Sequence, residues 1–282
     1  MTTKYDLHSH SYFSDGALSP TQLLEQAKEI GISHLALTDH DTTNGLSEAR
    51  LAAQQNSIEL INGVELSCNW NFQLLHVVGL NIDPQNDLLR QGIEQNRVSR
   101  IERAEAMFAD FEKHDIDLRE AVAAQLLINQ KQGELAVPTR PHFAQALVDA
   151  GFAKNKKQAF KRYLVRGKPG FIAMSWPSVQ EVGRWITASG GVAVLAHPMR
   201  YKFTRSKLIR LIEEMRPAGV HGIEVSTTTT DPQQTTMLAE LAKKYDLFAS
   251  LGSDFHSNDQ PWARLGGARP LPEGLTPVWK SF

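Results

Sequence analysis

Histidines and carboxylates recur in this sequence at spacings that suit a metal centre. His8 and His10 form one pair, and Asp254 and His256 form another, each separated by a single residue. In an extended strand, residues i and i+2 point to the same side, so both members of a pair can reach one metal ion. Five further candidates stand alone: Asp15, His40, Glu65, His76 and His197.

The types of candidate ligand narrow the choice of metal ion and of reaction. Imidazoles mixed with carboxylates, without a thiolate, suit Zn²⁺, Mn²⁺ or Fe²⁺. Nine candidates exceed the need of one ion, and Glu65 is the natural bridge because a carboxylate has two oxygens. Metal clusters of this kind match phosphoester hydrolysis, in which one ion activates water and the others neutralise phosphoryl oxygens. Isolated histidines are more often structural, and His34, His114 and His221 are interpreted in that way.

Most of these residues stand at the ends of predicted strands. The hydrophobic pattern predicts strands at 4–7, 34–38, 59–64, 74–80, 192–196, 222–225 and 247–251, with helices at 19–30, 178–189, 207–215 and 231–245. Such alternation predicts a parallel α/β fold, and α/β barrels place their active sites at the carboxyl ends of their strands. Residues 87–165 have a helical pattern almost throughout, which predicts a helical insertion into, or cap on, the α/β body.

Composition excludes several classes of protein. Of 282 residues, 41% are hydrophobic, and 30 basic residues face 31 acidic ones, so neither global disorder nor a uniformly basic nucleic-acid coat fits. No signal peptide is visible, and no apolar run approaches the ~18 residues that span a bilayer.

Cys68 is the single cysteine, and it is expected to be a buried small side chain. The absence of a disulfide fits the cytoplasm. No membrane association and no obligate protein partner is expected.

Six motifs in chain order carry a family resemblance. DLHSH, SDG, TDHD, GVE, AHP and GSDFH together resemble the PHP (polymerase and histidinol phosphatase) family over almost the whole chain. With HVVGLNID, TRPHF and the RGK segment, the sequence is most similar to the RNase AM subfamily of 5′-to-3′ exoribonucleases and 3′,5′-nucleotide bisphosphate phosphatases. The resemblance implies a distorted (β/α)₇ TIM-like barrel over 1–86 and 169–282, with a substrate-binding helical insertion over 87–168.

The resemblance also implies three divalent ions, usually Mn²⁺, with Zn²⁺, Fe²⁺ and Mg²⁺ as alternatives. Their implied ligand sets are His8, His10, Glu65 and Asp254; Glu65, His76 and His197; and Asp15, His40 and His256. Many members have histidine in place of Asp15, and the harder anionic ligand here favours Mn²⁺ or Mg²⁺. The expected nucleophile is a metal-bound hydroxide held by Glu65. A metal-bound water or His142 would protonate the leaving 3′-oxygen.

Basic residues in the predicted insertion indicate a polyanionic substrate. Seven of them lie between Asp149 and Glu181 with no acidic residue: Lys154, Lys156, Lys157, Lys161, Arg162, Arg166 and Lys168. They form either a solvated helix face or an electrostatic approach for RNA. Arg140 begins a predicted helix, where a guanidinium and helix N–H groups can hold a phosphate. The resemblance assigns Arg140 and His142 to substrate phosphate, and Lys168 and Arg200 are weaker candidates of the same type.

The leading hypothesis is therefore a phosphohydrolase acting on nucleoside 3′,5′-bisphosphates and short 5′-phosphorylated RNA. One alternative is a histidinol-phosphate phosphatase, although a basic insertion suits a larger anion. Another is an amidohydrolase-like C–N hydrolase, but no predicted strand end carries the lysine that such enzymes usually carboxylate. A third is a non-catalytic metal-binding module, which is disfavoured because no ligand position is lost.

Overall fold

The computed structural model describes residues 3–128 and 137–282. It divides into an α/β unit, Met1–Glu94 with Trp176–Phe282, and a helical unit, Gln95–Ser175. The α/β unit contains a seven-stranded sheet whose spatial order follows the chain. Its strands are β1 (Tyr5–Asp6), β2 (His34–Leu37), β3 (Glu59–Trp70), β4 (Gln73–Leu80), β5 (Val192–Leu195), β6 (Val220–Thr227) and β7 (Phe248–Gly252).

The sheet curls into a barrel whose first and last strands approach each other. The Leu7 N–H donates to the Leu251 carbonyl at 3.2 Å, and Ser9 bridges Phe255 in parallel. All neighbouring strands are parallel except β4, which is antiparallel to both β3 and β5. The purely parallel sheet expected from the sequence is therefore wrong at β4. Only two residues separate β3 from β4, and a parallel connection would need a crossover of a dozen or more.

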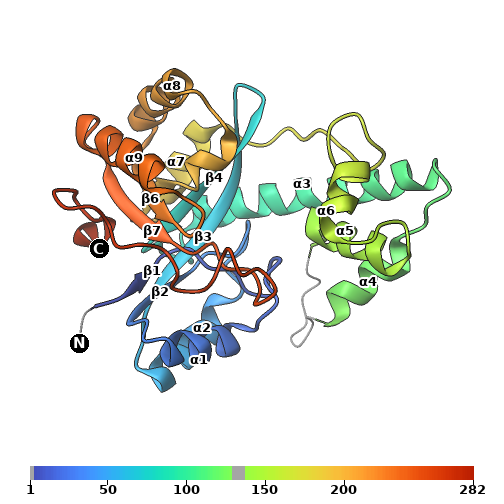
Figure 1. Ribbon diagram of the computed structural model, residues 1–282, viewed down its shortest axis with the longest axis horizontal. Helices are drawn as coiled ribbons and strands as arrows, with labels where there is room; N and C mark the ends of the chain where they lie inside the picture. Colours follow the sequence, from blue (N-terminus) through green and yellow to red (C-terminus); the bar gives the residue numbers. More distant parts are fainter. Residues whose placement is uncertain (1–2, 129–136) are drawn as a thin grey trace. The chain divides into compact units, whose positions relative to one another are not determined.

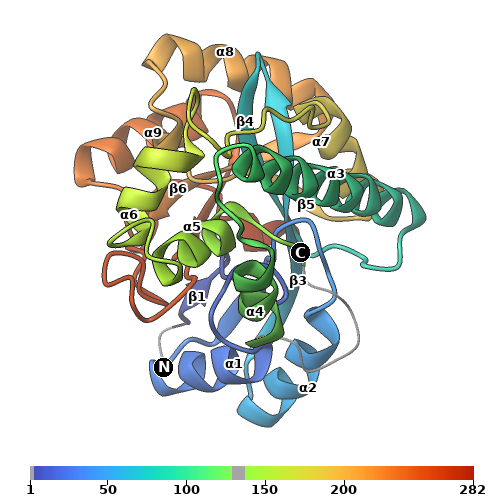
Figure 2. The same cartoon turned by 90° about the vertical axis from the view of Figure 1, so that its right-hand side faces the viewer.

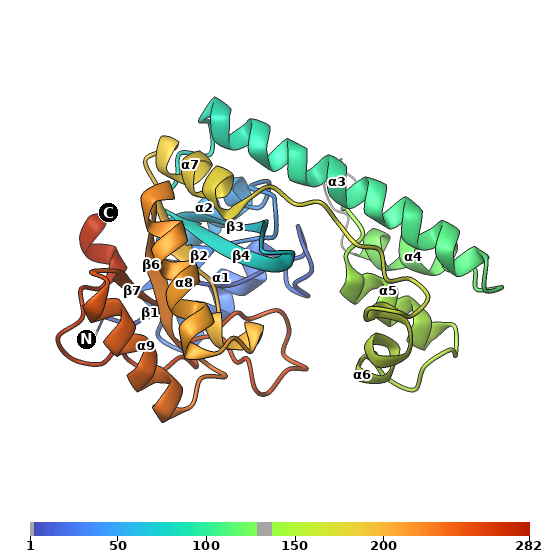
Figure 3. The same ribbon diagram turned by 90° about the horizontal axis from the view of Figure 1, so that it is seen from above.

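Helices cover the outside of the barrel (Figures 2 and 3). They are α1 (Pro20–Glu29), α2 (Leu46–Asn56), α7 (Val179–Ala188), α8 (Arg205–Met215) and α9 (Pro232–Lys244), with short helical turns η2 (Pro198–Tyr201), η3 (Arg216–Ala218) and η4 (Val278–Ser281). Capping boxes begin α1, α7 and α9, at Ser19, Ser178 and Asp231. These caps fix where each helix begins, and hence the loops between strand ends and helices.

The helical unit has its own hydrophobic core. Helix α3 (Asp87–Glu112) begins in the α/β unit and continues into the helical unit, followed by α4 (Arg119–Ile128), α5 (Arg140–Asp149), α6 (Lys156–Ala159) and η1 (Phe160–Leu164) (Figure 1). Phe111, Phe143, Leu147 and Leu164 are fully buried in this second core. None of the described helices combines the length and apolar character that a membrane span requires.

Candidate metal centre

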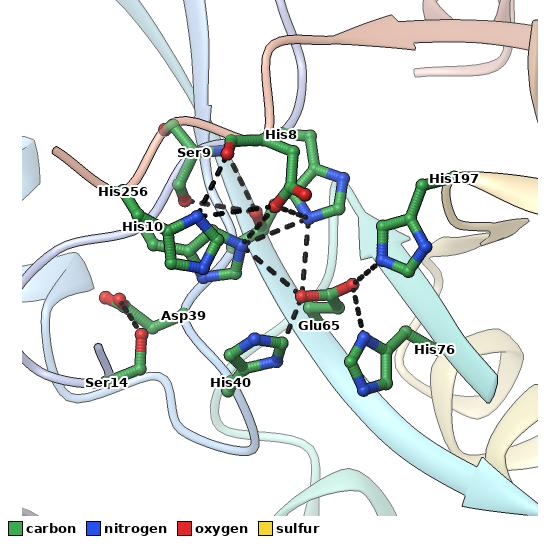
Figure 4. A network of polar contacts seen from close by, with 12 residues as sticks. His8, Ser9, His10, Ser14, Asp39, His40, Glu65, His76, His197 and His256 are labelled. Atoms are coloured by element: carbon green, nitrogen blue, oxygen red, sulfur yellow. Dashed lines mark hydrogen bonds and ion pairs between the residues drawn. The ribbon is translucent and has the colours of Figure 1, made fainter. Parts of the chain in front are cut away.

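Glu65 is the centre of a cluster of imidazoles in the α/β unit (Figure 4). It lies inside β3 and is fully buried. Its Oε1 lies 3.0 Å from Nδ1 of His76 and 2.9 Å from Nε2 of His197. Its Oε2 lies 2.9 Å from Nδ1 of His40. The carboxylate therefore turns one oxygen toward each of two groups of histidines.

The Oε2 side also meets the first histidine pair. Nε2 of His8 and Nε2 of His10 each lie 3.3 Å from Glu65 Oε2. Oδ1 of Asp254 lies 3.4 Å from the His8 nitrogen and 3.1 Å from the His10 nitrogen. His8, His10, Glu65 and Asp254 thus offer one donor atom each, all within 4.8 Å of one another. These four residues are one of the ligand sets that the sequence resemblance implies.

Two further sets gather next to this one. His10, Asp15, His40 and His256 offer donor atoms within 4.8 Å of one another, as do His40, Glu65 and His76. Asp15 Oδ1 lies 3.3 Å from His256 Nε2. With His197, which contacts Glu65, all nine ligand candidates from the sequence therefore come together. Of the residues that belong to two sets, only Glu65 has two donor oxygens with which it could reach two ions.

The donor set fits cations better than it fits hydrogen bonding alone. Glu65 Oε2 and Asp15 Oδ1 are buried acceptors without a hydrogen-bond partner, although imidazole nitrogens approach each of them to 3.3 Å or less. Nε2 of His8 and Nε2 of His10 face each other at 3.1 Å. Buried polar atoms are normally satisfied. Glu65 Oε2 and Asp15 Oδ1, which stay unsatisfied among converging nitrogens, are suited to bind positive ions.

The strands explain why residues far apart in sequence converge. His8 and His10 follow β1, His40 follows β2, and His197 follows β5. Glu65 was expected at a strand end but lies inside β3, because β3 continues to Trp70 in a hairpin with β4. His76 lies early in β4, yet it reaches the same edge because β4 runs in the opposite direction.

Some groups of the cluster already have the ionisation state that metal ligation needs. Burial would raise the pKa of Glu65, but His40, His76 and His8 hold this pKa well below its usual range. Burial, together with neighbouring His256, lowers the pKa of His10 to about 3. Burial likewise lowers the pKa of His76 to about 4. Metal ligands must be ionised carboxylates or neutral imidazoles, and these three groups meet that condition near neutral pH. Burial would lower the pKa of His8 and of His256, but nearby carboxylates raise the first well above its usual value and the second to about 9, so both would release a proton on binding a metal.

Buried carboxylates that are not among the ligand candidates hold some of the ligands in place by hydrogen bonds. Glu224, in β6, accepts a hydrogen bond from His8 Nδ1 at 2.7 Å and another from the His197 backbone N–H at 2.5 Å. This contact leaves Nε2 of His8 directed at the cluster, as for metal-bound histidines. Glu224 is not among the functional residues expected from the sequence. Its signal was an acidic residue inside the apolar run from Val220 to Val225.

Three buried aspartates accept hydrogen bonds from residues close in sequence to the ligands and so hold those segments in place. Asp39 accepts from the Ser11 N–H at 2.7 Å and from Ser14 Oγ at 2.6 Å, which fixes the loop that carries Asp15. Burial raises the pKa of Asp39 to about 6, against the lowering effect of these hydrogen bonds. Asp6 accepts from the backbone N–H of Ser253 at 2.8 Å. Likewise, Asp41 accepts from Ser67 N–H and Oγ.

The substrate candidates divide between the two units. Arg200, in η2, forms an ion pair with Asp254 beside the cluster. In the helical unit, Thr139 is the N-cap of α5 and donates its backbone N–H to His142 Nδ1 at 3.0 Å. A neutral His142 therefore carries its proton on Nε2. Lys168 is exposed, as are the other six basic residues of 154–168.

Arg140 lies in an arginine cluster that the sequence analysis did not identify. Burial lowers the pKa of Arg103, in α3, to about 10, and the nearby Arg140 and Arg100 guanidiniums contribute to this shift. Arg103 Nε is a buried donor without a hydrogen-bond partner. Concentrated positive charge of this kind is suited to an anion such as phosphate. The i, i+3 spacing of Arg100 and Arg103 on a helix was the available signal.

A barrel of this kind with a carboxylate-bridged histidine cluster defines a class of metal-dependent hydrolases. The chain belongs to the family described as PHP domain, whose model matches residues 6–266. Relatives include a protein named 5′-3′ exoribonuclease from Haemophilus influenzae. It is 40% identical over 282 residues, and the match covers 100% of each of the two chains. The 3′,5′-nucleoside bisphosphate phosphatase of Chromobacterium violaceum is 39% identical over 277 residues, with 98% of this chain and 95% of that protein covered.

Two solved structures share the fold of this chain. One from Chromobacterium violaceum, described as an amidohydrolase with bound sulfate and no metal, has a TM-score of 0.90 and 38% identity, covering 99% of this chain and 95% of that one. Another from Bifidobacterium adolescentis, described as a metal-dependent phosphoesterase, has a TM-score of 0.82 and 30% identity, covering 98% and 93%.

Proposed function

We propose that this chain is a metal-dependent phosphohydrolase with two related activities. It removes 5′-terminal nucleotides from short 5′-monophosphorylated RNA, and it removes the 3′-phosphate from nucleoside 3′,5′-bisphosphates. Both reactions hydrolyse an ester at a 3′-oxygen. The observation that carries the proposal is the carboxylate of Glu65, which meets His40, His76 and His197 within 3.0 Å. The names of full-length relatives support the same pair of activities.

Three divalent ions, with Mn²⁺ the expected metal, complete this proposal. Bound divalent ions lower the pKa of water and neutralise phosphoryl oxygens. His8, His10, Glu65 and Asp254 would hold one ion, and Glu65, His76 and His197 a second. Asp15, His40 and His256 would hold the third. Glu224 keeps His8 oriented, and Asp39 keeps the loop that carries Asp15 in place.

The substrate handle in this proposal is the terminal 5′-phosphate. Arg140 supplies a bidentate donor, supported by the positive charge of Arg100 and Arg103 around it. His142 has the tautomer that can donate a proton from Nε2, which suits either phosphate binding or protonation of the leaving oxygen. Arg200 and Lys168 are assigned secondary contacts with substrate. Asp254 already holds Arg200 near the cluster.

A panel of four substrates with Mn²⁺ tests this function. It contains a nucleoside 3′,5′-bisphosphate, a 5′-phosphorylated oligoribonucleotide, histidinol phosphate and a dihydropyrimidine. We expect turnover of the first two and loss of both activities after metal removal. Turnover of histidinol phosphate alone would support the smaller-substrate phosphatase instead. Turnover of the dihydropyrimidine alone would support C–N hydrolysis. Metal analysis of the same preparation identifies the ions and their number.

A further inference from the structure

Phe72 is an anomaly at the tip of the β3–β4 hairpin. Its side chain is 100% exposed, and its φ is +60°, next to Asn71 at +47°. A two-residue hairpin turn with both φ values positive favours Asn followed by Gly. A bulky side chain in the left-handed region costs roughly 1–2 kcal/mol. Neither burial nor turn geometry therefore accounts for an aromatic ring here.

The hairpin carries this ring past the metal centre. The last paired residues of β2 and β3 are Leu37 and Asn62, so the rest of β3 extends beyond the carboxyl end of β2. At about 3.3 Å per residue, Phe72 lies about 13 Å along the hairpin from His76. The His76 backbone N–H donates to Tyr201 Oη at 2.9 Å, which anchors the base of the hairpin to η2. The ring is thus held at a set distance from the cluster.

Basic side chains flank the same hairpin. Residues 200–210 contain five basic residues, of which Arg200, Arg205 and Arg210 pair with Asp254, Glu240 and Glu214. Lys202 and Lys207 contribute the remaining positive charge, and α8 lies beside the projecting end of the hairpin (Figures 1 and 2). The Lys207 ammonium lies 4.3 Å from the Phe203 ring centroid, and the Arg210 guanidinium lies 5.8 Å from the Trp70 ring centroid. Trp70 is only two residues before Phe72. An exposed ring beside a basic surface is the combination that binds single-stranded nucleic acid.

We propose that Phe72 is a stacking platform for a base of the RNA downstream of the 5′-terminal nucleotide. The ammonium groups of Lys202 and Lys207 attract the phosphates that follow. This inference rests on the proposed exoribonuclease function and assigns it a second contact surface, in the α/β unit. A nucleoside bisphosphate has a single base, which stays with the reacting phosphate, so Phe72 does not contribute to its turnover.

Phe72→Gly is the decisive variant because glycine relieves the strained turn. The melting temperature of this variant should equal or exceed that of the wild type, so a loss of activity will not reflect misfolding. We expect kcat/KM for an oligoribonucleotide to fall about 5- to 150-fold, the range for losing one base–aromatic stack. Turnover of the bisphosphate should be unchanged. Phe72→Tyr should keep full activity on both. Phe282→Ala, which removes an exposed aromatic ring near the chain end, is the matched control.

Abasic oligoribonucleotides locate the stacked base. One abasic nucleotide is moved along the RNA, and the wild type should lose activity at one position downstream of the 5′ end. Phe72→Gly should show no further loss at that position. Equal RNA turnover by wild type and Phe72→Gly overturns the stacking proposal, as does an equal loss on the bisphosphate, which would indicate a displaced His76. Failure of the wild type to degrade RNA at all would instead overturn the exoribonuclease function itself.

Discussion

The α/β unit buries the charged groups of its metal-ligand cluster, whereas the basic residues of 154–168 in the helical unit are exposed. Glu65 and Asp254 are at most 2% exposed and meet several fixed partners each. Lys154, Lys156 and Lys157 are exposed. Buried charges act strongly at short range in a poorly screening environment. Exposed charges act weakly and at a distance, and salt screens them. The two units should therefore respond to substitution in different ways.

The largest effect is expected at the centre of the buried cluster. Glu65→Gln keeps the shape of the side chain but removes the charge that faces two groups of histidines. We expect activity to be nearly abolished and bound metal to fall by more than one equivalent, because Glu65 is the proposed bridge. Metal analysis and turnover of the bisphosphate measure both. Glu59→Gln, an exposed carboxylate on the same strand, is the control. A Glu65→Gln protein with full metal content would disprove the bridge.

Arg140 tests the arginine cluster of the helical unit, in which positive charge is partly buried. Arg140→Ala should weaken turnover of the bisphosphate by about 1.5–3 kcal/mol, the range for a hydrogen bond to a charged group. It should also reduce the preference for 5′-phosphorylated over 5′-hydroxyl RNA. Arg119, which is exposed and paired with Glu105 and Glu112, provides the control Arg119→Ala. Unchanged discrimination between the two RNAs would remove Arg140 from the phosphate site.

Glu224 tests whether the carboxylates behind the ligands matter as much as the ligands. Glu224→Ala should weaken metal affinity by about 10- to 100-fold, as for other partners of metal-binding histidines. Activity should recover at high Mn²⁺, because the ligands themselves remain. Glu224→Gln, which keeps an acceptor for His8, should lie between Ala and wild type. A metal titration followed by activity measures this. Full activity at low Mn²⁺ in Glu224→Ala would show that His8 needs no such orientation.

The ligands could be predicted from sequence because their types are restricted and their spacing follows the strands. His8 with His10, and Asp254 with His256, share an i, i+2 signature. Glu224 has no such partner in sequence, and its role arises only when β6 lies beside β5. The arginine cluster is equally hard to predict from sequence, because its residues come from α3 and α5, which are distant along the chain.

The direction of β4 could have been predicted, but the pattern of alternating strands and helices concealed it. The hydrophobic pattern predicts 59–64 and 74–80 as separate strands and does not assign residues 65–73 to either. In the structure, β3 continues to Trp70, and only Asn71 and Phe72 remain for the turn. A two-residue turn permits a hairpin and excludes a crossover. The same short turn presents the exposed ring of Phe72.

The smallest effect is expected for the exposed basic residues of the helical unit. Replacing Lys154, Lys156 and Lys157 with Gln removes charge without touching a proposed metal ligand. If these lysines attract RNA, KM for an oligoribonucleotide should rise at low salt, and its salt dependence should flatten, since such attraction is screened over ~10 Å at 0.1 M salt. Bisphosphate turnover should hardly change, because that substrate carries few charges.

A triple variant of exposed lysines in the α/β unit, Lys28, Lys244 and Lys280 to Gln, removes the same net charge from elsewhere. If both triple variants change the salt dependence equally, the effect belongs to net charge and not to the basic segment. No change in either would identify 154–168 as a solvated surface.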